Sequence, residues 1–467
     1  MSGYLLLLPE ALLLTGAIAA LFGEMLPGRD RGTALIAAGL AVLAAAFAWP
    51  RGGAEVLFGG LLTADAASDV VRVAVLLLTA LWLLWIAGRG IEGERSREAV
   101  ALALFSSVGG LLLTRSTDLI TMFMALELST MPAYVLMGYR RGDVRGLEGA
   151  LKYFLLSMLT SLVMLYGLSF LYGISGTTLF SGIAEALPGS GSLGLVAVVL
   201  TLAGLFAKLS AAPFHFWAPD AYAGAPAASV AFVSTVPKIA GTLVLVRLVG
   251  VFDGLDTLPL VLAIVAAASM VLGNLAALGQ SDMRRLMAYS GVAHTGYLLV
   301  GLAAAAALGS EYGYLATVFY AIAYSVPSLA IMLVVAEEGD ALTDLVDLSS
   351  RRPRVAWSML IWLLSLIGIP PLAGFFGKLY LFGAGIDAGF QWLVIVGVVV
   401  SVVSAGYYFR VVRAMFQGVS AEEPADTAAA VAPAYTADAA LAFALVATIA
   451  LGIAAAPVME ALGLTLP

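Results

Sequence analysis

Long apolar runs follow one another along the whole chain, separated by short breaks that are charged or rich in Gly and Pro. The runs are continuous and do not alternate with a period of two, so the pattern favours helices over barrel strands. A helix needs about 20 apolar residues to cross a membrane. The pattern predicts fourteen spanning helices, at 4–22, 33–49, 70–88, 99–114, 117–139, 148–173, 193–222, 227–250, 257–279, 284–305, 312–336, 355–382, 389–417 and 437–458.

No break is long or polar enough to separate domains, so we expect one transmembrane domain. Its predicted parts are helices 1–3 in residues 1–98, a first five-helix repeat in 99–250, a second repeat in 257–417 and a last helix at 437–458.

Prolines interrupt two of the predicted helices beside a lysine. Pro213 and Pro219 follow Lys208 in helix 7, whereas Pro370 and Pro371 precede Lys378 in helix 12. Broken helices at corresponding places in two halves are typical of inverted-repeat transporters. We therefore predict that helices 4–8 and 9–13 are inverted repeats, with helices 7 and 12 broken.

The composition supports an all-α polytopic membrane protein. Hydrophobic residues make up 62% of the chain and charged residues 11%, where a soluble domain carries about 25%. So few charges exclude a soluble enzyme, a disordered protein and a nucleic-acid binder. The chain has no Cys, which excludes thiolate iron–sulfur clusters and cysteine zinc sites. We expect no metal and no cofactor on this chain.

The arginines predict how the chain is oriented. Fifteen of the nineteen fall on one side of the predicted helices, which we call the Arg-rich side, and Arg51, Arg72, Arg115 and Arg247 fall on the other. Cytoplasmic loops carry an excess of Lys and Arg, so both termini are expected outside. Arg247 lies late in its span and is expected to extend to the interface.

Six ionisable residues remain inside the spans and are candidates for function, because charge in a membrane is costly. They are Glu127, Lys152, Lys208, Lys238, His294 and Lys378. A buried lysine can lose its proton, whereas arginine does not, so lysines suit proton transfer. Alternatives stay open: Lys152 could snorkel to the interface, His294 could be a hydrogen-bonded core residue, and Glu127 could be a static partner.

Several ordered segments resemble the antiporter-like membrane subunits of bacterial respiratory complex I, an NADH:quinone oxidoreductase. They are LEGALKYFLLS from Leu147, PFHFWAPDAYAGAP from Pro213, STVPKIA from Ser234, SDMRRLMAYSGVAHTGYLLVGL from Ser281, GIPPLAGFFGKLYLF from Gly368 and SAGYYFRVVRAMF from Ser404.

The resemblance implies a fourteen-helix fold with two inverted five-helix repeats and a set of proton-carrying residues. It implies that Glu127 pairs with Lys208, that Lys238 follows, and that protons leave at Lys378. Lys152 and His294 match the lysine of helix 6 and the histidine of helix 10 in the family.

The function implied is proton translocation by a subunit without a redox site of its own. NADH, FMN, iron–sulfur clusters and quinone are then expected on other subunits. The expected partners are other antiporter-like and small membrane subunits, the lipid bilayer of the bacterial inner membrane and protons, with no nucleic acid. The alternatives are a subunit of a multisubunit cation/proton antiporter or of a membrane-bound hydrogenase, and a scaffold without transport.

Overall fold

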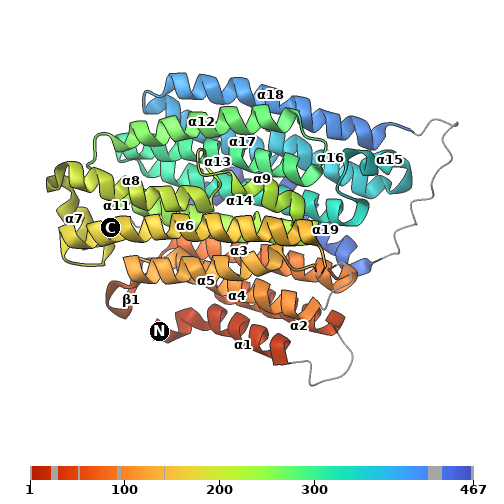
Figure 1. The fold of residues 1–467 in the computed structure, drawn as a ribbon, viewed down its shortest axis with the longest axis horizontal. Coiled ribbons are helices and arrows are strands. Elements are labelled where there is room, and N and C mark those ends of the chain that lie inside the picture. Colours follow the sequence, from red (N-terminus) through yellow and green to blue (C-terminus); the bar gives the residue numbers. More distant parts are fainter. Residues whose placement is uncertain are drawn as a thin grey trace.

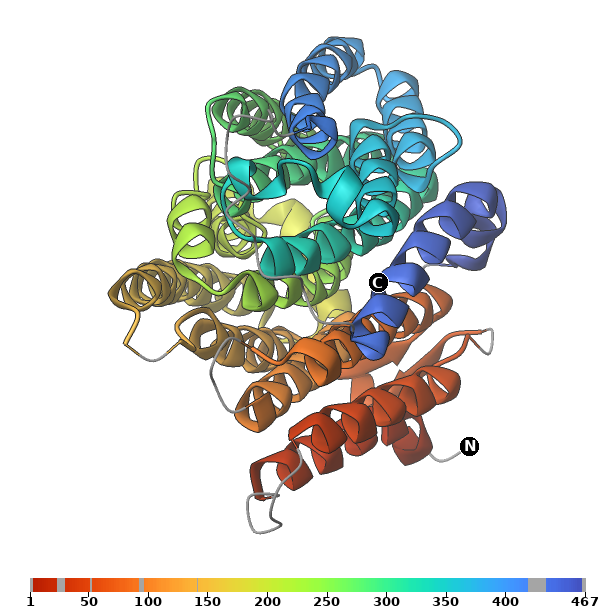
Figure 2. The ribbon, with the colours of Figure 1, turned by 90° about the vertical axis from the view of Figure 1, so that its right-hand side faces the viewer.

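The computed structural model describes residues 3–22, 30–50, 53–91, 96–140, 142–418 and 434–463. In this part of the chain the long helices run roughly parallel to one another in a single bundle (Figure 1). Figure 2 views the bundle along the helices, with α1 to α4 at one edge and α18 at the opposite edge. Their bounds are α1 (Leu8–Phe22), α2 (Asp30–Phe47), α3 (Ala66–Arg89), α4 (Ser96–Arg115), α5 (Leu119–Met137), α6 (Val144–Ser175), α7 (Phe180–Ala186), α8 (Gly191–Lys208), α9 (Trp217–Gly224), α10 (Ala227–Val233), α11 (Val236–Val251), α12 (Leu258–Leu278), α13 (Met283–Leu308), α14 (Glu311–Glu338), α15 (Leu348–Arg351), α16 (Pro353–Ile367), α17 (Ala373–Asp387), α18 (Gln391–Phe416), α19 (Tyr435–Ile453) and α20 (Ala455–Ala461).

Thirteen helices of the described part are long and apolar enough to cross a membrane. The remaining predicted span, 355–382, is present as α16 and α17, which have 15 residues each and are separated by residues 368–372. Each half alone is too short to span. Each of the fourteen predicted spans therefore overlaps either one of the thirteen long helices or the α16–α17 pair.

The two predicted breaks occur where the prolines stand. Residues 209–216 separate α8 from α9 and include Pro213, and residues 368–372 include Pro370 and Pro371. Proline has no backbone N–H and cannot continue the hydrogen-bonding pattern of a helix. Gly368 ends α16 with a φ of 95°, which glycine adopts without strain.

A third break was not predicted. It lies between α10 and α11, where Thr235 leaves the helical conformation and Pro237 then occupies the first turn of α11. Proline is common in the first turn of a helix, because its missing N–H would have no helical partner there. The break places Lys238 in the first turn of a buried helix.

A short hairpin also went unpredicted. Strands β1 (Glu55–Leu57) and β2 (Leu62–Ala64) pair antiparallel, with Val56 opposite Thr63. Leu62 also forms an isolated bridge with Ser116, just after α4. The hairpin therefore lies at the end of the bundle away from the Arg-rich side.

The centre of the bundle is formed by α14, α11 and α13. In the apolar 18-residue stretch of each helix, all residues of α14 are buried. The buried share is 94% for the α10–α11 pair and 83% for α13. The last long helix, α19, packs on α3 and α14, so the C-terminal region lies beside the N-terminal helices (Figure 2). Two of the candidate residues belong to these central helices, Lys238 to α11 and His294 to α13.

Candidate functional site, a line of buried titratable side chains

Glu127 and Lys208 form a buried ion pair between α5 and α8. The Lys208 ammonium lies 3.2 Å from Glu127 Oε1 and also donates to Ser157 Oγ at 2.7 Å and Tyr134 OH at 2.8 Å. Ser161 donates to the same Glu127 oxygen at 2.7 Å. The pairing implied by the resemblance is therefore present in the structure, and the hydroxyl groups of α5 and α6 complete it.

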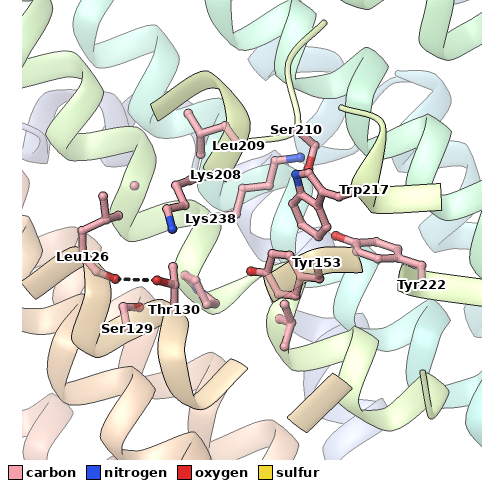
Figure 3. A pocket seen from close by; sticks show the side chains of 13 residues that line it. Leu126, Ser129, Thr130, Tyr153, Lys208, Leu209, Ser210, Trp217, Tyr222 and Lys238 are labelled. Carbon is pink, nitrogen blue, oxygen red and sulfur yellow. Dashed lines mark hydrogen bonds between the residues drawn. The ribbon is translucent and has the colours of Figure 1, made fainter. Parts of the chain in front are cut away.

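A small enclosed cavity separates Lys208 from Lys238. Its volume of about 20 Å³ exceeds the roughly 10–15 Å³ that one water molecule requires. Figure 3 shows the two lysines side by side with Ser129 and Thr130 nearby. Ser129 Oγ is buried and has no hydrogen-bond partner in the described part of the chain. The cavity thus combines space for water with polar groups that a water could bridge.

Lys238 points away from Lys208, toward α13. Its ammonium donates to the Gly291 carbonyl at 2.9 Å and lies 5.3 Å from the centroid of the Tyr324 ring on α14. Among the described residues no carboxylate forms an ion pair with Lys238. Carbonyl and ring contacts of this kind stabilise an ammonium without neutralising it.

His294 lies between the second and third buried lysines. Its Nδ1 is 2.6 Å from Tyr320 OH and its Nε2 is 3.3 Å from Tyr408 OH. The rings continue the connection, because Tyr324 contacts both His294 and Lys238.

Lys378 is held by the break in helix 12. Its ammonium donates to the carbonyls of Leu366 at 3.0 Å and Ile367 at 2.8 Å, and to Ser401 Oγ at 2.8 Å. Tyr297, whose ring also contacts His294, lies with its centroid 4.7 Å from this ammonium. The two proline-flanked lysines are not placed alike, since Lys208 precedes its break and Lys378 follows its break.

Lys152 lies apart from this line. Its side chain is 44% exposed and pairs with Glu148 at 2.8 Å and Asp220 at 3.0 Å. It lines a polar crevice of about 790 Å³ on the Arg-rich side, together with Arg284 and Arg285. The structure therefore joins Glu127, Lys208, Lys238, His294 and Lys378 and leaves Lys152 at the surface end of its helix.

Sequence reasoning missed the hydroxyl groups that surround the line. They belong to Tyr134, Ser157, Ser161, Tyr320, Ser401 and Tyr408, and the rings of Tyr297 and Tyr324 add to them. A signal was available, because Ser290, His294 and Tyr297 are spaced four and three residues apart on one face of a helix. Tyr320 and Tyr324 follow the same spacing.

Three buried arginines form ion pairs within the bundle, and one of them, Arg247, contradicts the expectation that it extends to the interface. Arg247 is fully buried and bonds both oxygens of Asp65 at 2.8 and 2.9 Å, so it does not snorkel. Arg72 is fully buried and bonds Glu10, and the largely buried Arg115 bonds Asp69 at 2.5 Å. These pairs join α1, α3, α4 and α11, because a buried guanidinium must be paired.

Comparisons with known proteins identify the family of this chain. The family described as NADH:quinone oxidoreductase/Mrp antiporter, TM, matches residues 116–404. NADH-quinone oxidoreductase subunit N of Jannaschia sp. (strain CCS1) is 38% identical over 433 residues, which cover 90% of this chain and 89% of the relative. This chain belongs to the subunit N family of NADH-quinone oxidoreductase.

Solved structures of related complexes share the fold of this chain over nearly its whole length. A chain of respiratory complex I from Thermus thermophilus, with bound aureothin, has a TM-score of 0.82 and 33% identity, covering 97% of this chain and 99% of that one. A chain of the Mrp complex from Dietzia sp. DQ12-45-1b has a TM-score of 0.82 at 24% identity, covering 98% and 95%, and shares the fold. The chain is thus a multi-pass, antiporter-like membrane protein.

Proposed function

We propose that this chain is a proton-translocating membrane subunit of an NADH:quinone oxidoreductase. The observation that supports it best is the line of five titratable side chains from Glu127 to Lys378. They lie buried one after another between α5 and α18, linked by hydroxyls, ring faces and a water-sized cavity. A static scaffold would have no use for three buried lysines of which only Lys208 has a carboxylate partner among the described residues.

In this proposal, protons enter from the Arg-rich side and reach Lys208 and Lys238 through water. They continue past His294 to Lys378 and leave on the other side. Glu127 controls the protonation of Lys208 and couples it to a neighbouring subunit. Moving one charge across the membrane costs about 2.3 kcal/mol per 100 mV, so the transfer needs an outside source of free energy.

That source, we propose, is electron transfer on other subunits of the complex. NADH, FMN, iron–sulfur clusters and quinone would bind there, and this chain would contact the other antiporter-like and small membrane subunits. The names of the subunit N relatives and the arginine distribution support a bacterial inner-membrane location, with both termini outside.

The test is to replace Lys208 or Lys378 with Met in the intact complex. Methionine keeps much of the side-chain volume but carries no proton. Proton-to-electron ratio and NADH-driven quinone reduction should fall together in both variants, whereas Arg413→Gln, at an exposed site on α18, should change neither. Normal proton-to-electron ratios in both lysine variants would refute the proposal.

Cation/proton antiport is the second candidate, because the matching family is described by both activities. A membrane-bound hydrogenase subunit is a variant of the first candidate in which a different redox reaction supplies the free energy. Sodium-dependent proton movement by the purified chain in vesicles, without any redox partner, would favour the antiporter.

A further inference from the structure

A groove between α16 and α19 is not used by the proton line. It is open, has a volume of about 820 Å³ and begins where both helices begin, on the Arg-rich side. Its walls are apolar, with Val355, Ile361 and Trp362 on α16 and Leu441 and Leu445 on α19. Ile361 is eight residues from the start of α16, so the groove extends about 12 Å along the helix.

Among the described residues at the rim of the groove, one cation is free to bind a ligand. Arg352 is committed to Glu337 and Glu338, and it lies 3.6 Å from Asp438. Arg89 is also held by Glu337, at 3.2 Å. Arg354 is exposed and forms no ion pair with any described residue. Arg354 therefore places a positive charge, unpaired among the described residues, above the apolar walls of the groove.

Trp362 adds a second, independent observation. Its side chain is fully buried and lines the groove, yet its indole N–H has no acceptor in the described part of the chain. Buried indole N–H groups normally have an acceptor. A ligand with an oxygen below its charged group would supply one.

Trp357 marks the level of the groove in the membrane. It is 58% exposed and packs edge-on against Phe416, with ring centroids 5.3 Å apart. Exposed tryptophan is typical of the boundary between hydrocarbon and headgroups. The occupant therefore has its charge at headgroup depth and its apolar part in hydrocarbon.

We propose that this groove binds one anionic phospholipid. Its phosphate lies at Arg354, an ester oxygen accepts from the Trp362 indole, and one acyl chain follows the walls formed by Ile361, Leu441 and Leu445. Charge complementarity and the acceptor requirement both favour this occupant over a neighbouring apolar helix.

The test measures lipid retention by the full chain, extracted in mild detergent with whatever subunits accompany it. Phosphatidylglycerol and phosphatidylethanolamine are added in equal amounts and the bound lipid is counted by native mass spectrometry. One basic residue near the headgroup is worth about fivefold in affinity, so phosphatidylglycerol should be retained about fivefold better. Arg354→Gln should remove this preference.

Two further variants separate charge from shape. Ala442 is exposed and lines the groove, so Ala442→Trp should fill it and lower retention of both lipids. Arg31→Gln removes an exposed charge on α2, on the same side but outside the groove, and should change nothing.

Two results would overturn the proposal. One is equal retention of both lipids by the unsubstituted chain, or a preference that survives Arg354→Gln. The other comes from a photo-crosslinker at position 442 in native membranes, which should capture lipid. Capture of a protein instead would assign the groove to a neighbouring subunit.

Discussion

At the scale of single residues, His294 is bound at both ring nitrogens by phenol groups. A neutral imidazole donates from one nitrogen and accepts at the other, and a tyrosine hydroxyl can do either. The contacts with Tyr320 and Tyr408 are therefore compatible with both tautomers. A ring held this way can receive a proton on one side and release one on the other without turning.

Gly291 offers a way to disturb Lys238 without removing its charge. A Cβ on Gly291 would meet Tyr324 OH at 3.2 Å and Lys238 Nζ at 3.5 Å. We expect Gly291→Ala to displace the Lys238 ammonium from the Gly291 carbonyl and lower proton pumping several-fold. The free energy of unfolding should fall by less than about 2 kcal/mol. Pumping in reconstituted vesicles and thermal unfolding of the purified protein measure the two effects.

Gly39 on α2 supplies the matched control, since a Cβ there would meet nothing within 4 Å. Gly39→Ala should pump normally. Equal losses in both variants would show that the effect at Gly291 is one of helix stability and not of the Lys238 contact.

The Arg247–Asp65 pair predicts a stability effect that a second substitution reverses. Arg247→Met leaves a buried carboxylate unpaired and should destabilise the protein by about 3–5 kcal/mol. Adding Asp65→Asn removes that charge and keeps a side chain able to cap α3, as Asp65 does through Ser68. Thermal unfolding should show most of the loss recovered, and an additive loss would contradict this.

Single residues were predicted better than their surroundings. Charges that lie inside apolar runs stand out in a sequence, so Glu127, Lys208, Lys238, His294 and Lys378 could be found. Their partners could not be found in this way, because a buried hydroxyl resembles any other core Ser or Tyr until distant helices are placed side by side. Arg247 was misjudged for the same reason, as its partner Asp65 is 182 positions away.

At the scale of helices, a glycine lets the two halves of the broken helix 12, α16 and α17, pack closely together. A Cβ on Gly374 of α17 would lie 1.9 Å from the Ser365 carbonyl oxygen of α16. Gly374→Ala must push the two half-helices apart and should cost about 1–3 kcal/mol in stability. It should also lower pumping, since the Leu366 and Ile367 carbonyls that bind Lys378 are neighbours of Ser365.

Gly383 on the same helix is the control, because its nearest atom would be Tyr312 OH at 3.7 Å. Gly383→Ala should unfold at the same temperature as the unsubstituted protein and pump normally. Unchanged pumping in a stably folded Gly374→Ala protein would mean that the spacing of the half-helices does not matter.

Helices were predicted from the length of the apolar runs, and this succeeded where a proline marked a break. The break between α10 and α11 was missed although Pro237 lies ten residues inside the predicted span 227–250; the structure shows that this proline begins a new helix, where proline is tolerated. The hairpin at Glu55–Ala64 is too short to leave a period-two pattern.

At the scale of the whole molecule, the orientation remains a prediction that is simple to test. The chain has no Cys, so single cysteines at exposed positions report without background. Ser192 lies at the start of α8 and Ser281 before α13, at opposite ends of the bundle. In right-side-out vesicles, a membrane-impermeant maleimide should label Ser192→Cys at once and Ser281→Cys only after permeabilisation. The reverse pattern would place the termini inside.

The single transmembrane bundle could be predicted from composition and periodicity, because lipid forces nearly every long segment into a helix. The order in which helices pack could not. The position of α19 beside α3, for example, depends on contacts between the two ends of the chain.

The backbone ligands of Lys238 and Lys378 have a consequence for genetics. Three of the oxygens that bind these two ammonium groups are main-chain carbonyls, of Gly291, Leu366 and Ile367, whereas every oxygen recorded at Lys208 belongs to a side chain. No codon change removes a carbonyl. A saturation screen of all side chains should therefore outline the Lys208 site through its neighbours. Around the other two lysines it should report Ser401, Tyr297 and Tyr324 but miss the carbonyl ligands, unless amide-to-ester substitutions are included.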